Sequence, residues 1–409
     1  MKDSIKLKLS DIAVISYGYT AKASVENVGS KFLRITDIQN DTVNWSSVPY
    51  CQINENDFEK YKLIDKDIVF ARTGATTGKS YLVCEPPKAI AASYLIRLRL
   101  KDPTIDAKFI SKYFQTQEYW DNISSGISGS AQGGFNASKL SELVIPLPPL
   151  SEQKRIVAIL DEAFEGIDRA IRNTEKNLSN ARELFESYLN SIFSQKGEGW
   201  EEKKLEDICE KVEYGSSAKS LAEGEIAVLR MGNIQNGAID WSNLVYTNDQ
   251  EEINKYLLKY NDVLFNRTNS DEHVGKTAIY KGEMPAIFAG YLIKIHRKEE
   301  LIDADFLNFY LNSPIAREYG KSIMSRSVNQ ANINGTKLKG YPISIPSLSI
   351  QKQIVKKLSF LRTETQRLEN IYRQKIAALK ELKQSILQKA FTGELTADKG
   401  EPAKEEIAA

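Results

Sequence analysis

The stretch Leu147–Leu160 reads LPPLSEQKRIVAIL, and the chain contains it a second time as IPSLSIQKQIVKKL at Ile345–Leu358. The second copy begins about half a chain length after the first. The residues that recur are Pro148, Leu150, Ser151, Gln153, Lys154, Ile156, Val157 and Leu160, answered by Pro346, Leu348, Ser349, Gln351, Lys352, Ile354, Val355 and Leu358. A duplication of this kind predicts two similar structural units.

Each copy predicts the start of a long helix. Proline breaks the preceding structure, and the side chain of Ser151 or Ser349 is expected to accept a hydrogen bond from a free backbone N–H of the first turn. Apolar residues then recur every three or four positions, to about Phe193 in the first copy and Phe391 in the second. At 1.5 Å per residue, each helix is roughly 60–65 Å long.

The apolar positions form one narrow stripe on each helix. In the first they are Ile156, Leu160, Ala163, Ile167, Ile171, Thr174, Leu178, Ala181, Phe185, Tyr188 and Ile192. In the second they are Ile354, Leu358, Leu361, Thr365, Leu368, Tyr372, Ile376, Leu379, Leu382, Ile386 and Ala390. Such a stripe is typical of a coiled-coil seam, and we predict that the two helices pair with each other, antiparallel. The second helix carries 10 basic and 4 acidic residues over 349–395, and the first carries 6 and 8 over 151–195, which suits this pairing.

The rest of the chain is also duplicated. KLSDIAVISYG (8–18) is answered by KLEDICEKVEYG (204–215), and DIVFART (67–73) by DVLFNRT (262–268). Short strands and helical segments alternate in each half, which predicts a mixed α/β domain of the α+β class. The expected divisions are 1–150 and 196–348 for the globular domains, 151–195 and 349–395 for the helices, and 396–409 for a disordered tail.

Composition excludes several classes of protein. The three cysteines are scattered and the histidines number two, so the sequence predicts no metal site, no disulfide framework and no histidine-based catalytic triad. No stretch approaches the ~20 apolar residues of a membrane span. The net charge of +1 gives no overall basic field. We expect a cytoplasmic protein.

Two motifs suggest nucleotide chemistry, and neither persists in the second half. ARTGATTGKS (71–80) is similar to a P-loop, but the spacing from Gly74 to Gly78 is one residue too short. IVAILDEAF (156–164) could supply an acidic strand end, yet its apolar residues continue the helical stripe. The chain also has no N/D-P-P-Y/F methyltransferase tetrapeptide. We therefore expect no catalytic residues and no bound cofactor.

The order of these motifs resembles the specificity subunit of type I restriction–modification enzymes. The resemblance rests on the duplicated PLPPLSEQKRIV-like stretch, on GW…KLEDI opening a globular half, on RTG…GK, and on the terminal AFTGEL (390–395). It implies two target-recognition domains, each reading one half of a bipartite double-stranded DNA site, joined by helices that pair antiparallel and set the spacing. It also implies docking of two modification subunits and, in the full enzyme, of ATP-dependent restriction subunits.

Residues shared by both halves are expected to position DNA, and divergent loops to read bases. The candidate DNA-binding residues are Arg34, Arg72, Thr73, Lys79 and Gln132 in the first half, and Arg230, Arg267, Thr268, Lys276 and Gln330 in the second. For the pairs Tyr94/Tyr291 and Asn136/Asn334 a structural role is favoured. The divergent loops are 19–29 against 216–225, 74–77 against 269–274, and 128–135 against 325–333.

Two other functions remain open. A coiled-coil scaffold for protein partners would show no salt-dependent affinity for DNA. A P-loop ATPase or a self-sufficient methyltransferase would bind ATP or S-adenosylmethionine as the isolated chain.

Overall fold

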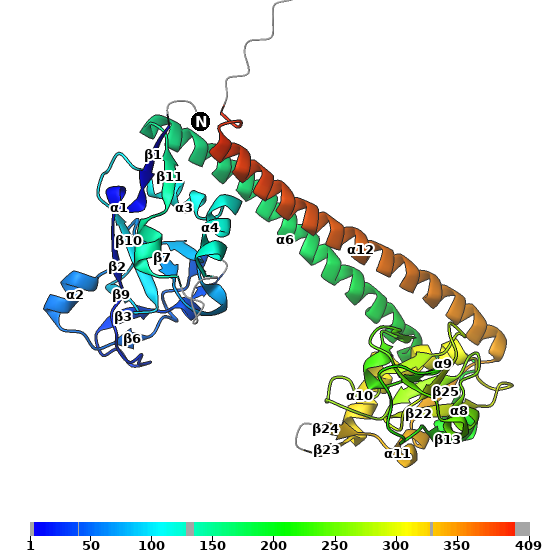
Figure 1. Cartoon of the computed structure of the whole chain (residues 1–409). Helices are drawn as coiled ribbons and strands as arrows, with labels where there is room; N and C mark the ends of the chain where they lie inside the picture. The colour runs from blue at the N-terminus through cyan, green and yellow to red at the C-terminus, as the bar shows by residue number, and fades with distance from the viewer. Residues whose placement is uncertain (1–3, 40, 128–134, 328–329, 397–409) are drawn as a thin grey trace, which may run out of the picture. The chain divides into compact units, whose positions relative to one another are not determined.

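The structure is a computed structural model that describes residues 4–39, 41–127, 135–327 and 330–396. The chain divides into two compact units (Figure 1). The first unit consists of Met1–Thr174 and Gln374–Ala409, and the second of Glu175–Arg373. The helices α6 (Leu150–Ser194) and α12 (Leu348–Thr392) each contribute one end to each unit. Of the predicted tail 396–409, residues 397–409 lie outside the described residues.

The first unit is built on small sheets that are antiparallel except for the parallel pair β3–β9. Its strands are β1 (Ile5–Lys8), β2 (Ala13–Tyr17), β3 (Ser30–Leu33), β4 (Ile38–Gln39), β5 (Thr42–Val43), β6 (Tyr50–Cys51), β7 (Ile68–Ala71), β8 (Ser80–Leu82), β9 (Ala89–Ala91), β10 (Leu95–Leu100) and β11 (Val144–Leu147). Its short helices are α1 (Leu9–Ile12), α2 (Glu55–Tyr61), α3 (Ala107–Tyr113), α4 (Gln117–Ile127) and α5 (Ala137–Ser141), with 3₁₀ turns η1 (Ile35–Asp37) and η2 (Gly74–Thr76). The main sheet has the order β2-β10-β7-β8, and a second has the order β6-β3-β9.

The second unit repeats this plan. Its strands are β12 (Glu201–Lys204), β13 (Cys209–Tyr214), β14 (Ile226–Leu229), β15 (Ile234–Gln235), β16 (Ala238–Ile239), β17 (Val245–Thr247), β18 (Val263–Asn266), β19 (Thr268–Asn269), β20 (Thr277–Ile279), β21 (Ala286–Phe288), β22 (Leu292–Arg297), β23 (Ser325–Ser327), β24 (Gln330–Asn332) and β25 (Pro342–Ile345). Its short helices are α7 (Leu205–Ile208), α8 (Gln250–Tyr256), α9 (Ala304–Leu311), α10 (Pro314–Ile323) and α11 (Gly335–Lys339), with the 3₁₀ turn η3 (Met231–Asn233). The sheet β13-β22-β18-β20 matches β2-β10-β7-β8, and β17-β14-β21 matches β6-β3-β9. The predicted α+β fold with an internal repeat is therefore confirmed.

The first strand of each globular half pairs with the strand that leads into its long helix. β1 is antiparallel to β11, with Ile5 opposite Leu147, and β12 is antiparallel to β25, with Glu201 opposite Ile345. Figure 1 shows β1 and β11 side by side in the first unit. The chain therefore enters and leaves each globular half at the same place.

Each copy of the duplicated stretch contains a glutamine that is buried where the long helix meets its globular half. Gln153 is 1% exposed; its Oε1 accepts from the backbone N–H of Asp106 at 2.8 Å, and its Nε2 donates to the Pro148 carbonyl at 2.8 Å. Gln351 makes the same two contacts with Asp303 and Pro346, at 2.8 and 2.9 Å. Because Asp106 and Asp303 cap helices α3 and α9, each glutamine fixes the long helix to its own domain.

The predicted serine caps are wrong. α6 begins at Leu150 and α12 at Leu348, so Ser151 and Ser349 lie inside the first turn, where both are exposed. The carbonyl of Pro149 instead accepts from the backbone N–H groups of Glu152 and Gln153.

The long helices run antiparallel within each unit. In the first unit Asp168 of α6 bonds Lys383 of α12 at 2.7 Å, and Arg155, further toward the start of α6, reaches the Thr396 carbonyl. Leu160 and Phe164 share a core with Leu387 and Ala390.

In the second unit Arg182 of α6 bonds Glu369 of α12 at 3.0 Å. Leu189 and Phe193, toward the end of α6, share a core with Leu358, toward the start of α12. The order of contacts along the two helices is again opposite, and the predicted antiparallel pairing is confirmed.

The predicted stripe is wrong at three positions. Tyr188, Leu368 and Leu382 are 36%, 40% and 48% exposed. Near its end, α6 packs on the second globular half as well as on α12, so the buried positions there are Leu189 and Phe193. On α12, the heptad spacing predicts that Leu382 is buried, but the buried residue is Leu387.

The P-loop look-alike has another structure. Arg72–Ser80 connects β7 to β8 through η2, and both strands belong to one antiparallel sheet. A P-loop needs a helix after its glycine loop to hold phosphate, and here a strand follows. The neighbouring look-alike, 156–164, lies inside α6, as its periodicity predicts.

Candidate nucleic-acid interface

One arginine holds the same place in both halves, directly after a buried strand of the main sheet. The Arg72 guanidinium stacks on the Tyr17 ring at 4.9 Å, and that of Arg267 on the Tyr214 ring at 4.8 Å. Each arginine Nε is buried and has no hydrogen-bond partner among the described residues. Buried donors are nearly always paired in folded proteins, so these two arginines are suited to receive an acceptor from a ligand.

The stacking tyrosines are themselves held in place. The Tyr17 hydroxyl accepts from the backbone N–H of Ala137 at 3.1 Å, and the Tyr214 hydroxyl accepts from Gly335 at 2.7 Å. These amides are the first of α5 and α11, whose N-caps are Asn136 and Asn334. The predicted structural role of the two asparagines is confirmed.

A glycine follows each of these tyrosines because the chain passes close to another strand. A Cβ on Gly18 would lie 2.2 Å from the Ala92 carbonyl oxygen, and one on Gly215 would lie 2.2 Å from that of Phe288. No side chain fits at that distance. The Tyr-Gly pair of each half therefore fixes where the stacked arginine lies.

A second tyrosine lies next to each arginine. The backbone N–H of Arg72 donates to the Tyr94 carbonyl at 3.2 Å, and that of Arg267 donates to the Tyr291 carbonyl at 3.0 Å. The rings of Tyr94 and Tyr291 are 60% and 49% exposed. The structural role expected for these tyrosines is thus carried by their backbone carbonyls, which accept the arginine N–H groups. Their exposed rings are free to stack on a ligand.

In the second unit several candidates border one concave surface of about 610 Å³. It is lined by Arg230, Lys276 and Tyr291 together with polar residues of η3, β15 and β19, among them Asn233, Gln235 and Asn269. The sequence predicts Arg230 and Lys276 as DNA-binding residues in separate segments, and the fold brings them together on this surface. Such a basic, amide-rich surface with an exposed aromatic ring can hold phosphate and base edges.

Residues 1–178 and 197–380 match the family described as the type I restriction modification DNA specificity domain. The chain belongs to this family. The putative type I restriction enzyme MjaX specificity subunit of Methanocaldococcus jannaschii is 33% identical over 211 residues, covering 51% of this chain and 49% of that protein, about half its length. The EcoKI specificity subunit of Escherichia coli K12 is 26% identical over 387 residues, covering 89% of this chain and 82% of that protein.

Solved structures show the same fold. A chain from a study of complex assembly and conformational transition of the type I R-M system superposes with a TM-score of 0.75 at 18% identity, covering 96% of this chain and 98% of that one. The HsdS subunit of Thermoanaerobacter tengcongensis superposes with a TM-score of 0.57 at 19% identity, covering 97% and 98%. The type I specificity subunit is a DNA-recognition subunit without catalysis of its own.

The two halves of this specificity subunit treat one shared arginine differently. Arg34 forms a bidentate pair with Asp37, at 3.0 and 2.7 Å, and this hydrogen bonding raises the pKa of Arg34. In the second half the corresponding residue is the neutral Asn233, which accepts from the backbone N–H of Arg230, and the Arg230 side chain donates to the Asn243 carbonyl and forms no ion pair with a described residue. Arg230 therefore has a positive charge available for DNA, whereas that of Arg34 is already compensated.

The other candidates of the specificity subunit fall into two groups. Thr73 and Lys79 are exposed beside η2, and Gln330 is exposed on β24. Thr268 is buried, and its hydroxyl accepts from Asn332 at 2.7 Å, which is a structural contact. Gln132 lies outside the described residues.

The divergent loops differ in form as well as in sequence. In the second half β19, β24 and β23 make a three-stranded sheet beside Arg267, and Arg326 pairs with Asp271 at 2.7 Å. In the first half the short η2 turn occupies the place that follows Arg72. Loop 128–135 lies outside the described residues except for Phe135.

Sequence reasoning missed Tyr17 and Tyr214 as parts of the site, although both stand in the repeated segment that ends in Tyr-Gly. That repetition was the available signal. Among the residues that the structure describes, no helix is long and apolar enough to span a membrane. The same residues contain no cluster of three or more His, Cys, Asp or Glu side chains suited to a metal ion.

Proposed function

We propose that each globular half, 1–150 and 196–348, reads one half of a bipartite, gapped DNA site. The supporting observation is the Arg-Tyr pair, which has the same geometry in both halves and is surrounded by loops that differ. Shared residues cannot distinguish two half-sites, so Arg72, Arg267 and Lys79 would contact phosphate. Base reading falls to the divergent loops, while the shared residues Thr73, Gln330, Arg230 and Lys276 at their borders would position the DNA.

The proposal also covers the partner subunits and the cellular compartment. The paired helices α6 and α12 would dock two modification subunits and set the distance between the half-sites, and restriction subunits that use ATP would join the full enzyme. The complex would work in the cytoplasm, where chromosomal DNA is available.

A domain exchange tests this division of labour. Residues 1–150 are replaced by the matching half of another specificity subunit, and DNA from cells that also carry the modification partner is sequenced with a methylation-sensitive method. We expect one half of the methylated sequence to change and the other half to remain. A simultaneous change in both halves would contradict the proposal, and loss of all methylation would be checked by co-purification of the partner.

A further inference from the structure

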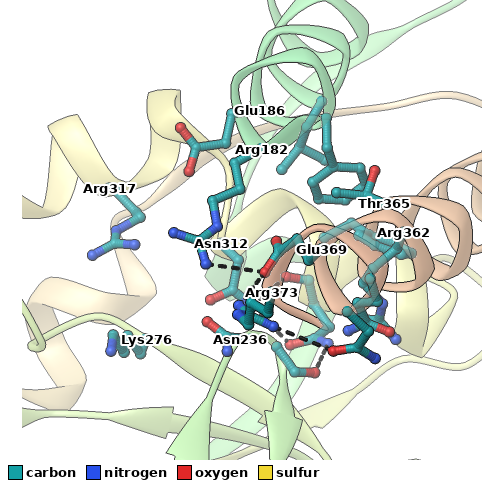
Figure 2. A pocket seen from close by; sticks show the side chains of 17 residues that line it. Arg182, Glu186, Asn236, Lys276, Asn312, Arg317, Arg362, Thr365, Glu369 and Arg373 are labelled. Carbon is teal, nitrogen blue, oxygen red and sulfur yellow. Dashed lines mark hydrogen bonds and ion pairs between the residues drawn. The ribbon is translucent and has the colours of Figure 1, made fainter. Parts of the chain in front are cut away.

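A second basic cavity, of about 730 Å³, lies in the second unit between α9, α10, the β15–β16 turn and the long helices. Figure 2 shows Arg182, Lys276 and Arg317 around the same space, with Arg362 and Arg373 on α12. The lining contains these five cations and two carboxylates, Glu186 and Glu369.

Internal pairing compensates only part of this charge. Glu369 binds both Arg182 and Arg373. Arg317 donates to a backbone carbonyl, that of Glu272, and Lys276 donates to the neutral Gln235 side chain. Burial, followed by the nearby charge of Arg317, lowers the pKa of Lys276. The cavity therefore keeps an excess of positive charge.

Arg362 is the most informative of the five. Its guanidinium lies 5.2 Å from the centre of the Phe309 ring and makes no ion pair or hydrogen bond with any residue that the structure describes. Burial lowers the pKa of Arg362, and the charge of Asp305 offsets this only partly. A mostly buried cation without a partner is costly unless an anion completes it.

The first unit offers an internal comparison, because there the same junction is neutralised. Lys112 lies over the Phe164 ring at 4.7 Å and pairs with Asp161 at 2.9 Å. By the repeat, Phe309 stands for Lys112, Arg362 for Phe164 and Ser359 for Asp161. In the second unit the cation is therefore on the long helix and the ring on the globular half, the reverse of the first unit. The position of Asp161 is taken by a serine, which carries no charge.

The cavity borders the candidate DNA surface at one shared residue. Lys276 lines both this cavity and the concave surface that holds Arg230 and Tyr291. A polyanion lying across that surface passes Lys276 and meets Arg317 and Arg362 next. The shared Lys276 favours a DNA strand over an isolated anion or an acidic protein segment.

We propose that this cavity binds a backbone phosphate of the DNA beyond the bases read by the second half, with Arg362 and Arg317 as its contacts. Among the described residues of the first half, the matching cation, Lys112, is already paired with Asp161. The proposal rests on the proposed DNA-reading function and makes the two halves unequal: the second would grip DNA over a longer stretch.

The test uses the full chain in complex with its modification subunits and duplex DNA that carries its methylated sequence. Arg362→Gln and Arg317→Gln are compared with Lys112→Gln, the matched change in the first unit. Loss of one phosphate contact lowers the slope of log affinity against log salt by about 0.9. We expect this drop for Arg362→Gln and Arg317→Gln, with base preference unchanged, and no drop for Lys112→Gln.

Single methylphosphonate substitutions then locate the contact. One neutral linkage outside the second half-site should weaken binding by the wild type and leave Arg362→Gln unaffected. Unchanged slopes in both cavity variants, with thermal unfolding as a check of folding, would overturn the proposal. Loss of modification subunits with DNA affinity intact would assign the cavity to an acidic protein segment instead. If the wild-type complex showed no sequence preference at all, the proposed function itself would fail.

Discussion

Arg72 and Arg267 combine a shared position with a buried Nε that has no hydrogen-bond partner among the described residues, and this makes them the first targets for substitution. We expect Arg267→Ala or Arg72→Ala to weaken DNA binding across all sequences and to lower the salt slope by about one if the residue contacts phosphate. The measurement is affinity at several salt concentrations. Arg267→Lys keeps the charge and should keep most of the slope.

A different result would reassign these arginines. If discrimination at one base position fell by about 1–3 kcal/mol while the salt slope stayed constant, the arginine would read a base edge. Binding to cognate and unrelated duplexes in the same salt series separates the two outcomes.

Single residues also show where sequence reasoning reaches and where it ends. Recurrence of Gln153 and Gln351 marked an important position, but only the fold reveals that each binds a helix cap almost fifty positions away. Arg34 and Arg230 look equivalent in the sequence, and a change from Asp37 to Asn233 alters their available charge. These roles depend on contacts between distant segments of the chain, and the local sequence pattern does not reveal such contacts.

The two long helices could be predicted almost completely, because a narrow apolar stripe determines both their length and their pairing. The stripe failed near the end of α6, where packing on the globular domain widens the buried face, and at Leu368 and Leu382 on α12. Leu387 and Leu382 provide a matched pair on one helix, being 1% and 48% exposed.

We expect Leu387→Asp to destabilise the protein by several kcal/mol, because it buries an unpaired carboxylate in the core of the first unit. Leu382→Asp should change the free energy of unfolding by less than about 0.5 kcal/mol. Urea unfolding of both variants measures this. Equal destabilisation by the two substitutions would contradict the arrangement of α6 and α12 described above.

The pairing of the helices in the second unit should depend on acid. The hydrogen bond from Arg182 lowers the pKa of Glu369 from its ordinary value of 4.5, against an opposing effect of burial. A carboxylate whose pKa is lower in the folded state stabilises the fold above about pH 4.5, and this stabilisation disappears as the pH falls through the folded-state pKa.

We expect wild type and Glu369→Gln to differ at pH 7 by about 0.2–1 kcal/mol, the range of exposed ion pairs, and to converge below the folded-state pKa. The free energy of unfolding across a pH series gives the comparison. A difference that persists undiminished at the lowest pH would show that the carboxylate charge is not responsible.

For the molecule as a whole, the length of the helices should determine the gap in the DNA site. One heptad of helix spans about 10 Å, and one base pair spans about 3.4 Å. Deleting one heptad from the middle of both α6 and α12 should therefore shorten the methylated gap by about three base pairs, or abolish activity, without changing the bases read. Methylation-sensitive sequencing measures the gap, and altered bases at unchanged spacing would contradict the prediction.

The first unit contains the last helical turns of the chain, and this has a consequence for synthesis. Phe391 packs against Phe109 and Tyr113, with ring centres 5.0 and 5.6 Å away, and Leu387 and Ala390 belong to the same core. The first globular half therefore keeps an uncovered apolar face until the end of α12 has been translated. A nascent chain that stops before Gln374 would lack the part of α12 that completes the core of the first unit, so a truncation late in the chain would expose apolar surface in the domain translated before it.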